Sequence, residues 1–379
     1  MTKRLILAGG GHAHLAVLKA LARSPLRGVE VLLVTPQVRL SYSGMLPGWL
    51  AGHYERREIE IDLQPLAQRA NVACVEATVD AMDADRRCVV LSNGRHVEFD
   101  VLSLDVGSEI DTSWLETLGE RLLPLRPLPE FMNRWPAVLS AARARPGFHV
   151  AVAGAGAAAF EVALAVRYAL VRQCRDSRVC LVGPRDRFLH GHSAGTRRRG
   201  EAWLRRAGVA VHDGRAVSYR HGLLTADGAQ FPADAVIAAT GAAAPSWLKL
   251  SRVQLDRDGF VAVDATHRSV SHPHVFAAGD VCARQDRSFS RSGVHAVRAG
   301  PVLAHNLCAA LQDRPLRRYR PRSRSLYLMA CGERSAVVSW GALSADGAWA
   351  WRWKDRIDRR FVQRHSVLPD ERRLSEMQA

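Results

Sequence analysis

The chain has 379 residues, of which 47% are hydrophobic, and its formal net charge is +16. A chain of this length holds roughly two or three domains. The absence of a run of about 18 apolar residues argues against a membrane-spanning helix, and the absence of a nucleic-acid-binding motif disfavours DNA and RNA as partners. The positive charge favours an anionic partner such as a membrane surface or a phosphorylated ligand, although solvated surface arginines explain it equally well.

The seven cysteines are scattered along the chain and include no C-x-x-C pair. This distribution predicts a reducing, cytoplasmic environment and no cysteine-based metal site. Because the first predicted strand begins at Lys3, we expect no signal peptide before it.

A glycine-rich turn follows the first predicted strand. The apolar run at residues 5–8 leads into Gly-Gly-Gly-His-Ala-His at residues 9–14, and a predicted helix over 12–23 with a strand over 29–34 completes a βαβ unit. Backbone N–H groups at such a helix N-terminus bind a pyrophosphate, and the glycines let the main chain approach it closely.

A second glycine-rich turn has the same context. The sequence VAVA at residues 150–153 is followed by GAGAAA at residues 154–159, which opens an apolar helix. One such turn is a weak signal, whereas two predict two dinucleotide sites in one chain. A flavin and a nicotinamide are the pair that this arrangement suggests, and hence electron transfer.

Two further predicted strands end at glycine. Residues 274–280 end in Gly279-Asp280, where the carboxylate can accept hydrogen bonds from ribityl hydroxyls, and residues 235–241 end at Gly241. In this order the elements resemble the pyridine nucleotide–disulfide oxidoreductase superfamily over roughly residues 3–365.

The resemblance implies an α/β fold with two Rossmann-like three-layer nucleotide-binding domains, for FAD and NAD(P), and a C-terminal α+β cap. The chain is expected to enter the FAD-binding domain twice. The expected boundaries are 1–112 and 251–320 for the two parts of the FAD-binding domain, 113–250 for the NAD(P)-binding domain, and 321–379 for a C-terminal region with a basic, tryptophan-rich helix.

The segment at residues 39–48 (RLSYSGMLPG) contains no cysteine. Disulfide reductases and peroxidases of the superfamily carry a redox cysteine here, where Ser43 now stands, and a hydroxyl cannot cycle through thiolate and sulfenate. Electrons are therefore expected to pass from flavin straight to an acceptor, as in type II NADH:quinone oxidoreductases. This segment, residues 12–14 and residues 293–301 resemble a bacterial branch of that group, some of whose members are fused to selenophosphate synthetase.

Three positions depart from the superfamily pattern. His14 replaces the third glycine of the first turn, either as a packing variant or as a polar group near the flavin. Thr35 replaces the acidic residue that normally holds the adenosine ribose. In the second unit no carboxylate ends the corresponding strand, and Arg185 and Arg187 follow it instead. Either arginine could bind the 2′-phosphate of NADPH, so the choice between NADH and NADPH is left open. The alternative is that both are ordinary surface arginines.

Glu161 and His295 are the catalytic candidates. In type II dehydrogenases a glutamate at the position of Glu161 faces the nicotinamide–flavin junction, and burial in an apolar helix would raise its pKa; a packing role is the alternative. His295 begins a helix whose N-terminal dipole should stabilise reduced flavin. Together with Arg298 it replaces the glutamine-containing pattern of the quinone reductases, which weakens the case for a quinone.

The resemblance also implies a set of cofactor contacts. For FAD these are Gly9, Gly11, His12, His14, Thr35, Ser43, Gly44, Met45, Val79, Gly107, Gly279, Asp280, His295 and Ala296. For NAD(P)H they are Gly154, Gly156, Ala157, Glu161, Arg185 and Gly241.

The expected function is an FAD-dependent NAD(P)H oxidoreductase that passes hydride from the nicotinamide to the flavin and then electrons to a quinone or other small acceptor. One alternative is a flavoenzyme acting on a sulfur or selenium compound, although the surroundings of Cys282 and Cys331 do not reproduce a sulfide-oxidising arrangement. The other is a non-catalytic redox sensor that binds FAD and NAD(P)H. A homodimer is compatible with each of these functions.

A stripe of four apolar residues marks the C-terminal helix, namely Trp349, Trp353, Ile357 and Phe361. Arginines and Lys354 flank it, a combination typical of peripheral attachment to an anionic membrane, here its inner face. The alternative is that the stripe packs on the FAD-binding domain or on a second subunit.

Overall fold

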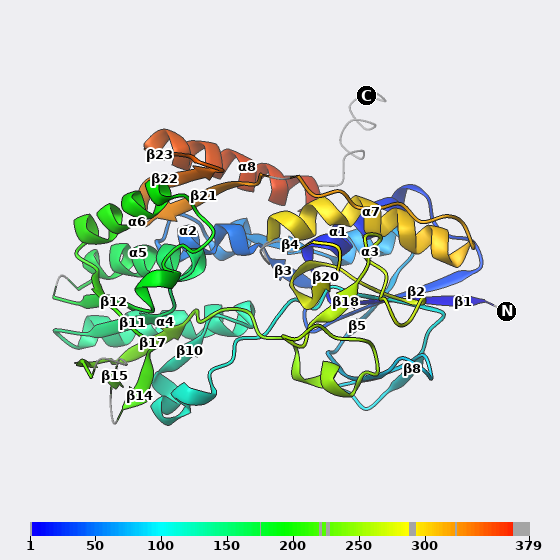
Figure 1. The fold of residues 1–379 in the computed structure, drawn as a ribbon, viewed down its shortest axis with the longest axis horizontal. Coiled ribbons are helices and arrows are strands. Elements are labelled where there is room, and N and C mark those ends of the chain that lie inside the picture. Colours follow the sequence, from blue (N-terminus) through cyan, green and yellow to red (C-terminus); the bar gives the residue numbers. More distant parts are fainter. Residues whose placement is uncertain are drawn as a thin grey trace, which may run out of the picture.

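The computed structural model describes residues 2–174, 176–219, 222–224, 228–287, 293–322 and 324–366. Two parallel five-stranded sheets form its two halves (Figure 1). Each sheet has helices on one face and a small antiparallel sheet on the other, so each half has three layers.

The first sheet carries the N-terminal glycine turn. Its strands in spatial order are β19 (Val275–Ala277), β9 (Val101–Leu104), β1 (Lys3–Ala8), β2 (Val29–Thr35) and β5 (Ala73–Glu76). Leu5 and Leu7 face the helices, while Ile6 and Ala8 face the small antiparallel sheet on the opposite side. Both faces are buried, which is why the strand reads as a continuous apolar run instead of an alternating one.

The layers of this half come from segments far apart in sequence. The helices are α1 (His12–Arg23), α3 (Gln64–Arg69) and α7 (Gly293–Leu311), and the meander is β6 (Val79–Asp83), β7 (Cys88–Leu91) and β8 (His96–Glu98). Gly300 lets α7 cross α1 closely, because a Cβ there would lie 2.7 Å from the Ala16 Cβ.

The second sheet repeats this plan. Its strands in spatial order are β10 (Leu122–Pro124), β17 (Ala235–Ala238), β11 (His149–Ala153), β12 (Arg178–Val182) and β13 (Ala210–His212). The helices of this half are α4 (Leu128–Ala144), α5 (Ala157–Val171) and α6 (Ala194–Ala207). The other face of the sheet is covered by η3 (Ser113–Arg121), β14 (Val217–Tyr219), β15 (Gly222–Leu224) and β16 (Gln230–Pro232).

The C-terminal region spans both halves. An antiparallel sheet of β21 (Leu326–Cys331), β22 (Glu333–Trp340) and β23 (Leu343–Gly347) packs on α5 and α6. The helix α8 (Ala348–Ser366) lies against β22 and then runs along the top of the molecule toward α1 and α7 (Figure 1). The predicted α/β fold with two Rossmann-like units and an α+β cap is confirmed.

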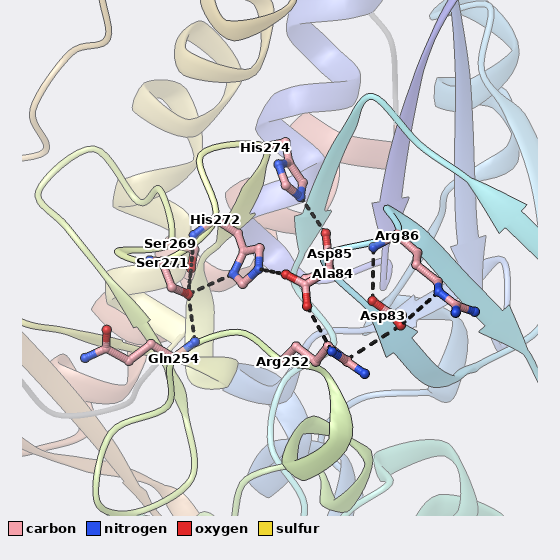
Figure 2. A network of polar contacts seen from close by, with 10 residues as sticks. All are labelled: Asp83, Ala84, Asp85, Arg86, Arg252, Gln254, Ser269, Ser271, His272 and His274. Carbon is pink, nitrogen blue, oxygen red and sulfur yellow. Dashed lines mark hydrogen bonds and ion pairs between the residues drawn. The ribbon is translucent and has the colours of Figure 1, made fainter.

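The chain returns to the first half after β17. Figure 2 shows the polar contacts that hold the returning segment against the first half. His272 contacts Asp85 in the β6–β7 turn, with 3.0 Å between Nε2 and Oδ1, and Arg252 forms an ion pair with the same carboxylate at 3.2 Å. His274 Nε2 lies 2.8 Å from the Ala84 carbonyl oxygen. Residues of the expected segments 1–112 and 251–320 therefore share one sheet and one polar network, while the domain boundaries themselves stay predictions.

Short elements complete the described chain. They are β3 (Arg39–Ser41), η1 (Ser43–Met45), α2 (Leu46–Leu50), η2 (Arg56–Glu58), β4 (Glu60–Asp62), η4 (Arg185–Arg187), η5 (Ser246–Leu250), β18 (Val261–Val263), η6 (Gly279–Val281) and β20 (Cys282–Arg284). Within the described ranges, no helix combines the length and hydropathy needed to cross a bilayer.

Candidate functional site

The first glycine turn packs tightly against the end of β9. Gly9 has a φ of +92°, and a Cβ at this position would collide with the carbonyl oxygen of Asp105. Gly11 is the N-cap of α1, and its Cβ would lie 2.5 Å from the Asp105 carboxyl carbon. The first backbone amides of α1 are thus presented at the carboxyl edge of the sheet, where dinucleotides bind.

His14 is explained by packing. Its ring is fully buried, with Nδ1 2.6 Å from the Gly9 carbonyl oxygen and Nε2 2.8 Å from Ser103 Oγ. Burial lowers the pKa of His14 to about 4, so the ring is neutral. Both ring nitrogens are taken by protein atoms, which favours the packing interpretation of the missing third glycine.

His12 differs from His14 in having an unsatisfied nitrogen. Its Nε2 is buried without a hydrogen-bond partner among the described residues, and burial lowers its pKa to about 4. The ring packs on Tyr42 at 5.5 Å and on Phe361 at 5.9 Å between centroids. A buried ring nitrogen without a partner at the start of α1 suits a bound dinucleotide, because buried polar atoms are normally hydrogen-bonded.

Asp280 and Gly279 stand beside this turn. Gly279 has a φ of +71°, and its added Cβ would lie 2.5 Å from Asp105 Oδ1. Asp280 pairs with Arg126 at 2.9 Å, and the same guanidinium donates to Ser108 Oγ. The predicted ribityl-binding carboxylate is therefore oriented by an arginine that lies just after β10 of the second sheet.

The predicted adenosine end lies along β2. Thr35 is buried and donates its hydroxyl to the Gln37 carbonyl oxygen at 2.9 Å. A Cβ on Gly10 would come within 3.0 Å of Thr35 Oγ1, so the hydroxyl lies directly at the glycine turn. Val79 is buried at the start of β6, and Gly107 has a φ of +77° with open space where a Cβ would be.

The cysteine-free segment Ser43–Met45 is anchored from the C-terminal helix. Lys354 Nζ donates to the Gly44 carbonyl oxygen at 2.6 Å and pairs with Asp358 at 2.6 Å. Tyr42 donates its hydroxyl to the other oxygen of Asp358 at 3.2 Å. Burial opposes the charge on Lys354, but Asp358 and Glu161 outweigh it and raise the pKa of Lys354, which stays an ammonium.

Glu161 faces this cluster from α5. Its Oε1 accepts the Ala330 amide of β21 at 2.7 Å. Burial raises the pKa of Glu161 to about 7, against the lowering effects of Lys354 and the Ala330 amide. The structure therefore brings the predicted proton-handling carboxyl next to the lysine that holds the predicted flavin-facing segment.

His295 and Ala296 lie near the start of α7. Both are buried, and burial lowers the pKa of His295. They line a cavity of about 510 Å³ together with Gly279 and Asp280. The N-terminal end of α7 and the residues that follow β19 therefore line the same cavity.

The second glycine turn repeats the geometry of the first. Gly154 has a φ of +144°, and its added Cβ would collide with the carbonyl oxygen of Ala239. Gly156 is the N-cap of α5, which begins at Ala157, and Gly241 has a φ of +120° with open space beside it. Arg185 follows β12 with its side chain exposed, while its backbone amide donates to Asp213 at 2.8 Å.

The apolar stripe of α8 is shorter than expected. Trp349, Trp353 and Ile357 are 48%, 42% and 42% exposed. Phe361 instead stacks on Tyr42 with 4.6 Å between ring centroids, which agrees for this residue with the alternative of packing on the FAD-binding domain, and Lys354 is buried. The reason is that the helix drifts by about 40° every four residues, which rotates Phe361 onto the first half of the molecule.

A comparison with protein families decides the affiliation. The model of the pyridine nucleotide-disulphide oxidoreductases matches residues 3–306. The chain belongs to this family. Its cofactors are therefore FAD and NAD(P)H, as the resemblance implied. No curated protein matches the sequence significantly.

Solved structures support the family fold over almost the whole chain. The sulfide:quinone oxidoreductase from Aquifex aeolicus is 17% identical with a TM-score of 0.78, covering 99% of this chain and 95% of that one. NDH2 from Plasmodium falciparum in complex with NADH is 12% identical with a TM-score of 0.78, covering 96% and 98%. A NAD-dependent persulfide reductase from A. fulgidus is 19% identical with a TM-score of 0.73, covering 93% and 66%.

Three residues of the candidate site were not predicted from the sequence. Asp105 had a signal, because it directly follows a buried strand and precedes Gly107 by two residues, much as Asp280 follows β19. Arg126 and Lys354 had none, since their partners Asp280 and Gly44 are 154 and 310 residues away in the chain.

Proposed function

We propose that this protein oxidises NAD(P)H through FAD and delivers the electrons to a quinone or another small acceptor, without a redox-active disulfide. The observation that carries the proposal is the anchoring of Ser43–Met45, where the superfamily's redox cysteine would stand, to a buried lysine that also faces Glu161. When bound, FAD would supply the chemistry of hydride acceptance and electron donation, for which the protein provides alignment and electrostatics without a covalent intermediate.

The residues around the two glycine turns bind and orient. The N-termini of α1 and α5 present positive partial charge to the two pyrophosphates. Arg126 fixes the carboxylate of Asp280 for the ribityl hydroxyls. The N-terminal end of α7, at His295, supplies the dipole that favours negative charge on the reduced cofactor.

Glu161 holds or releases the proton that accompanies electron transfer. With a pKa of about 7, both of its protonation states are populated near neutral pH, the condition under which a general acid–base group works best. Lys354 and Asp358 extend the ionisable cluster from Glu161 toward Tyr42. This chain of groups reaches from the predicted nicotinamide side to the segment at Gly44.

A quinone-type acceptor is favoured over a sulfur or selenium compound by the state of the buried thiol near Glu161. The fold itself does not separate the two, because the similar sulfide:quinone oxidoreductase is named for both a sulfur compound and a quinone. Cys331 is buried beside Glu161, and burial together with that carboxyl raises the pKa of its thiol, which disfavours the thiolate needed for sulfur chemistry.

Anaerobic half-reactions test the proposal. The purified flavoprotein is mixed with NADH or NADPH, and bleaching of the flavin absorbance is followed; the reduced protein is then mixed with a short-chain quinone, a persulfide or a selenium compound. We expect bleaching by at least one nucleotide and fast reoxidation by the quinone. Reoxidation by the persulfide or selenium compound alone contradicts the quinone proposal, and bleaching without turnover of any acceptor favours a redox sensor.

A further inference from the structure

A buried carboxyl group lies inside the wall of the predicted FAD cradle. Asp105 follows β9 and is only 4% exposed. Its Oδ2 accepts the Ala13 amide at 2.7 Å and the His14 amide at 3.0 Å. These amides belong to the first turn of α1, which is where the pyrophosphate of a dinucleotide binds.

The glycines of the cradle close around this carboxyl. An added Cβ would lie 2.5 Å from the carboxyl carbon at Gly11 and 2.5 Å from Oδ1 at Gly279. One carboxyl oxygen thus holds the start of α1, and the other lies against the end of β19. Asp105 is therefore surrounded by the backbone that is predicted to contact FAD, with no room between them for a solvent layer.

The charge state of Asp105 therefore bears on FAD binding. An ionised carboxylate here would stand beside the pyrophosphate, and two like charges repel strongly where water is excluded. A neutral carboxyl avoids this repulsion and can still accept both amides. Burial raises the pKa of Asp105 to about 8, although the His14 and Ala13 amides favour the charged form.

Other ionisable groups at this corner do not offer the same change of charge. They are His12 and His14 on α1, His295 on α7, Asp280 on η6 and Arg126 between β10 and α4. Burial lowers the pKa of all three histidines, so they are neutral above pH 7. Asp280 and Arg126 form an ion pair at 2.9 Å.

We propose that Asp105 couples FAD binding to the uptake of one proton from solvent, so that its carboxyl is neutral whenever the pyrophosphate is in place. Below about pH 8 the carboxyl is already protonated and binding takes up no proton. At higher pH Asp105 must take up one proton from solvent for each FAD that binds, so the affinity for FAD falls by up to about tenfold per pH unit. The inference concerns FAD binding alone and does not depend on the electron acceptor.

Titration of the FAD-free protein with FAD, followed by quenching of flavin fluorescence from about pH 6.5 to pH 9, tests the coupling. The dissociation constant of the unmodified protein is expected to rise about tenfold between about pH 7 and pH 9. Asp105→Asn keeps the acceptor oxygen but does not ionise, so its dissociation constant should be flat and lower than that of the parent at pH 9.

Asp100→Asn is the matched control. Asp100 stands at the opposite end of the same strand and accepts the Arg4 amide at 2.6 Å, far from the cradle, so this variant should keep the parent's pH dependence. A flat pH dependence in the parent, or an unchanged slope in Asp105→Asn, overturns the proposal.

Calorimetry keeps the proposal testable if Asp105→Asn fails to fold. FAD is titrated into the unmodified protein in two buffers with different ionisation enthalpies, and the difference in heat gives the number of protons taken up. We expect close to one proton at about pH 9 and none at about pH 6.5. Equal heats in the two buffers at pH 9 overturn the proposal.

Discussion

Glu161, half-buried on α5, and Lys354, buried on α8, lie on different elements yet interact electrostatically. Burial raises the pKa of Glu161 to about 7, and the neighbouring ammonium limits that rise. The raised pKa also makes the free energy of unfolding depend on pH. The stabilisation from Glu161 is fully present below the pKa of 4.5 that it has in the unfolded chain. It is lost as the pH rises to about 7, because the carboxyl group must then ionise in a desolvated place.

Glu161→Gln should slow turnover while FAD stays bound. The change keeps the shape of the side chain and its acceptor for the Ala330 amide, but removes the titrating proton. General acid–base roles typically contribute about 10²–10⁴-fold. Steady-state rates over pH 5.5–8.5, with FAD content as the control, check this; a rate and pH profile equal to the parent's would leave Glu161 a structural residue.

Lys354→Met should move the pH profile upward. Removing the ammonium takes away an interaction that lowers the pKa of Glu161, so the ionisation near pH 7 should shift to a higher pH. Arg352→Met, an exposed neighbour on the same helix, is the control and should leave the profile in place. If both variants titrate alike, Lys354 does not act on Glu161.

At the scale of elements, α8 has two different faces. One face packs against both halves of the molecule through Lys354, Asp358 and Val362, which are buried. The other exposes Trp349, Trp353 and Ile357 beside Arg352 and Arg356. Exposed tryptophan next to arginine suits the headgroup region of an anionic bilayer, so we propose that this face attaches the protein peripherally to a membrane.

Replacing Trp349, Trp353 and Ile357 together by alanine should abolish binding to anionic vesicles. Each arginine near such a surface contributes about 1 kcal/mol, which high salt screens. Co-sedimentation at low and high salt measures this, with neutral vesicles for comparison. Leu250→Ala is the matched control, because Leu250 is 82% exposed on η5 and should not affect binding. No sedimentation of the parent protein at low salt contradicts membrane attachment.

At the scale of the whole molecule, electron transfer should be independent of cysteine. The described structure contains only free cysteines, and the segment at Ser43 carries none. A variant with the buried Cys282 and Cys331 changed to alanine and the other five to serine should keep flavin reduction by NAD(P)H at a rate within about twofold of the parent, since no covalent step is involved. Stopped-flow absorbance measures it. Loss of this half-reaction in a folded variant, judged by circular dichroism and bound FAD, contradicts a cysteine-free mechanism.

Local sequence determined the two nucleotide-binding units, the FAD and NAD(P)H cofactors and the family. A strand, a glycine turn and an apolar helix lie within about 20 residues of each other, so their geometry follows from local propensity and from the few residues that tolerate a φ such as that of Gly9. Glu161 and Asp280 could be singled out as site candidates from local sequence too, since each lies within a few residues of a glycine at the end of a predicted strand.

Only the tertiary structure decided how distant segments meet at the site. Arg126 reaches Asp280, and Lys354 reaches Gly44, across 154 and 310 residues. Burial raises the pKa of Asp105 and Glu161. It depends on every neighbour that excludes water, and no periodic pattern in the sequence reports it. Phe361 does not belong to the exposed face of α8 for a similar reason. Its contact with Tyr42 joins residues far apart in the chain, so it exists only in the folded molecule.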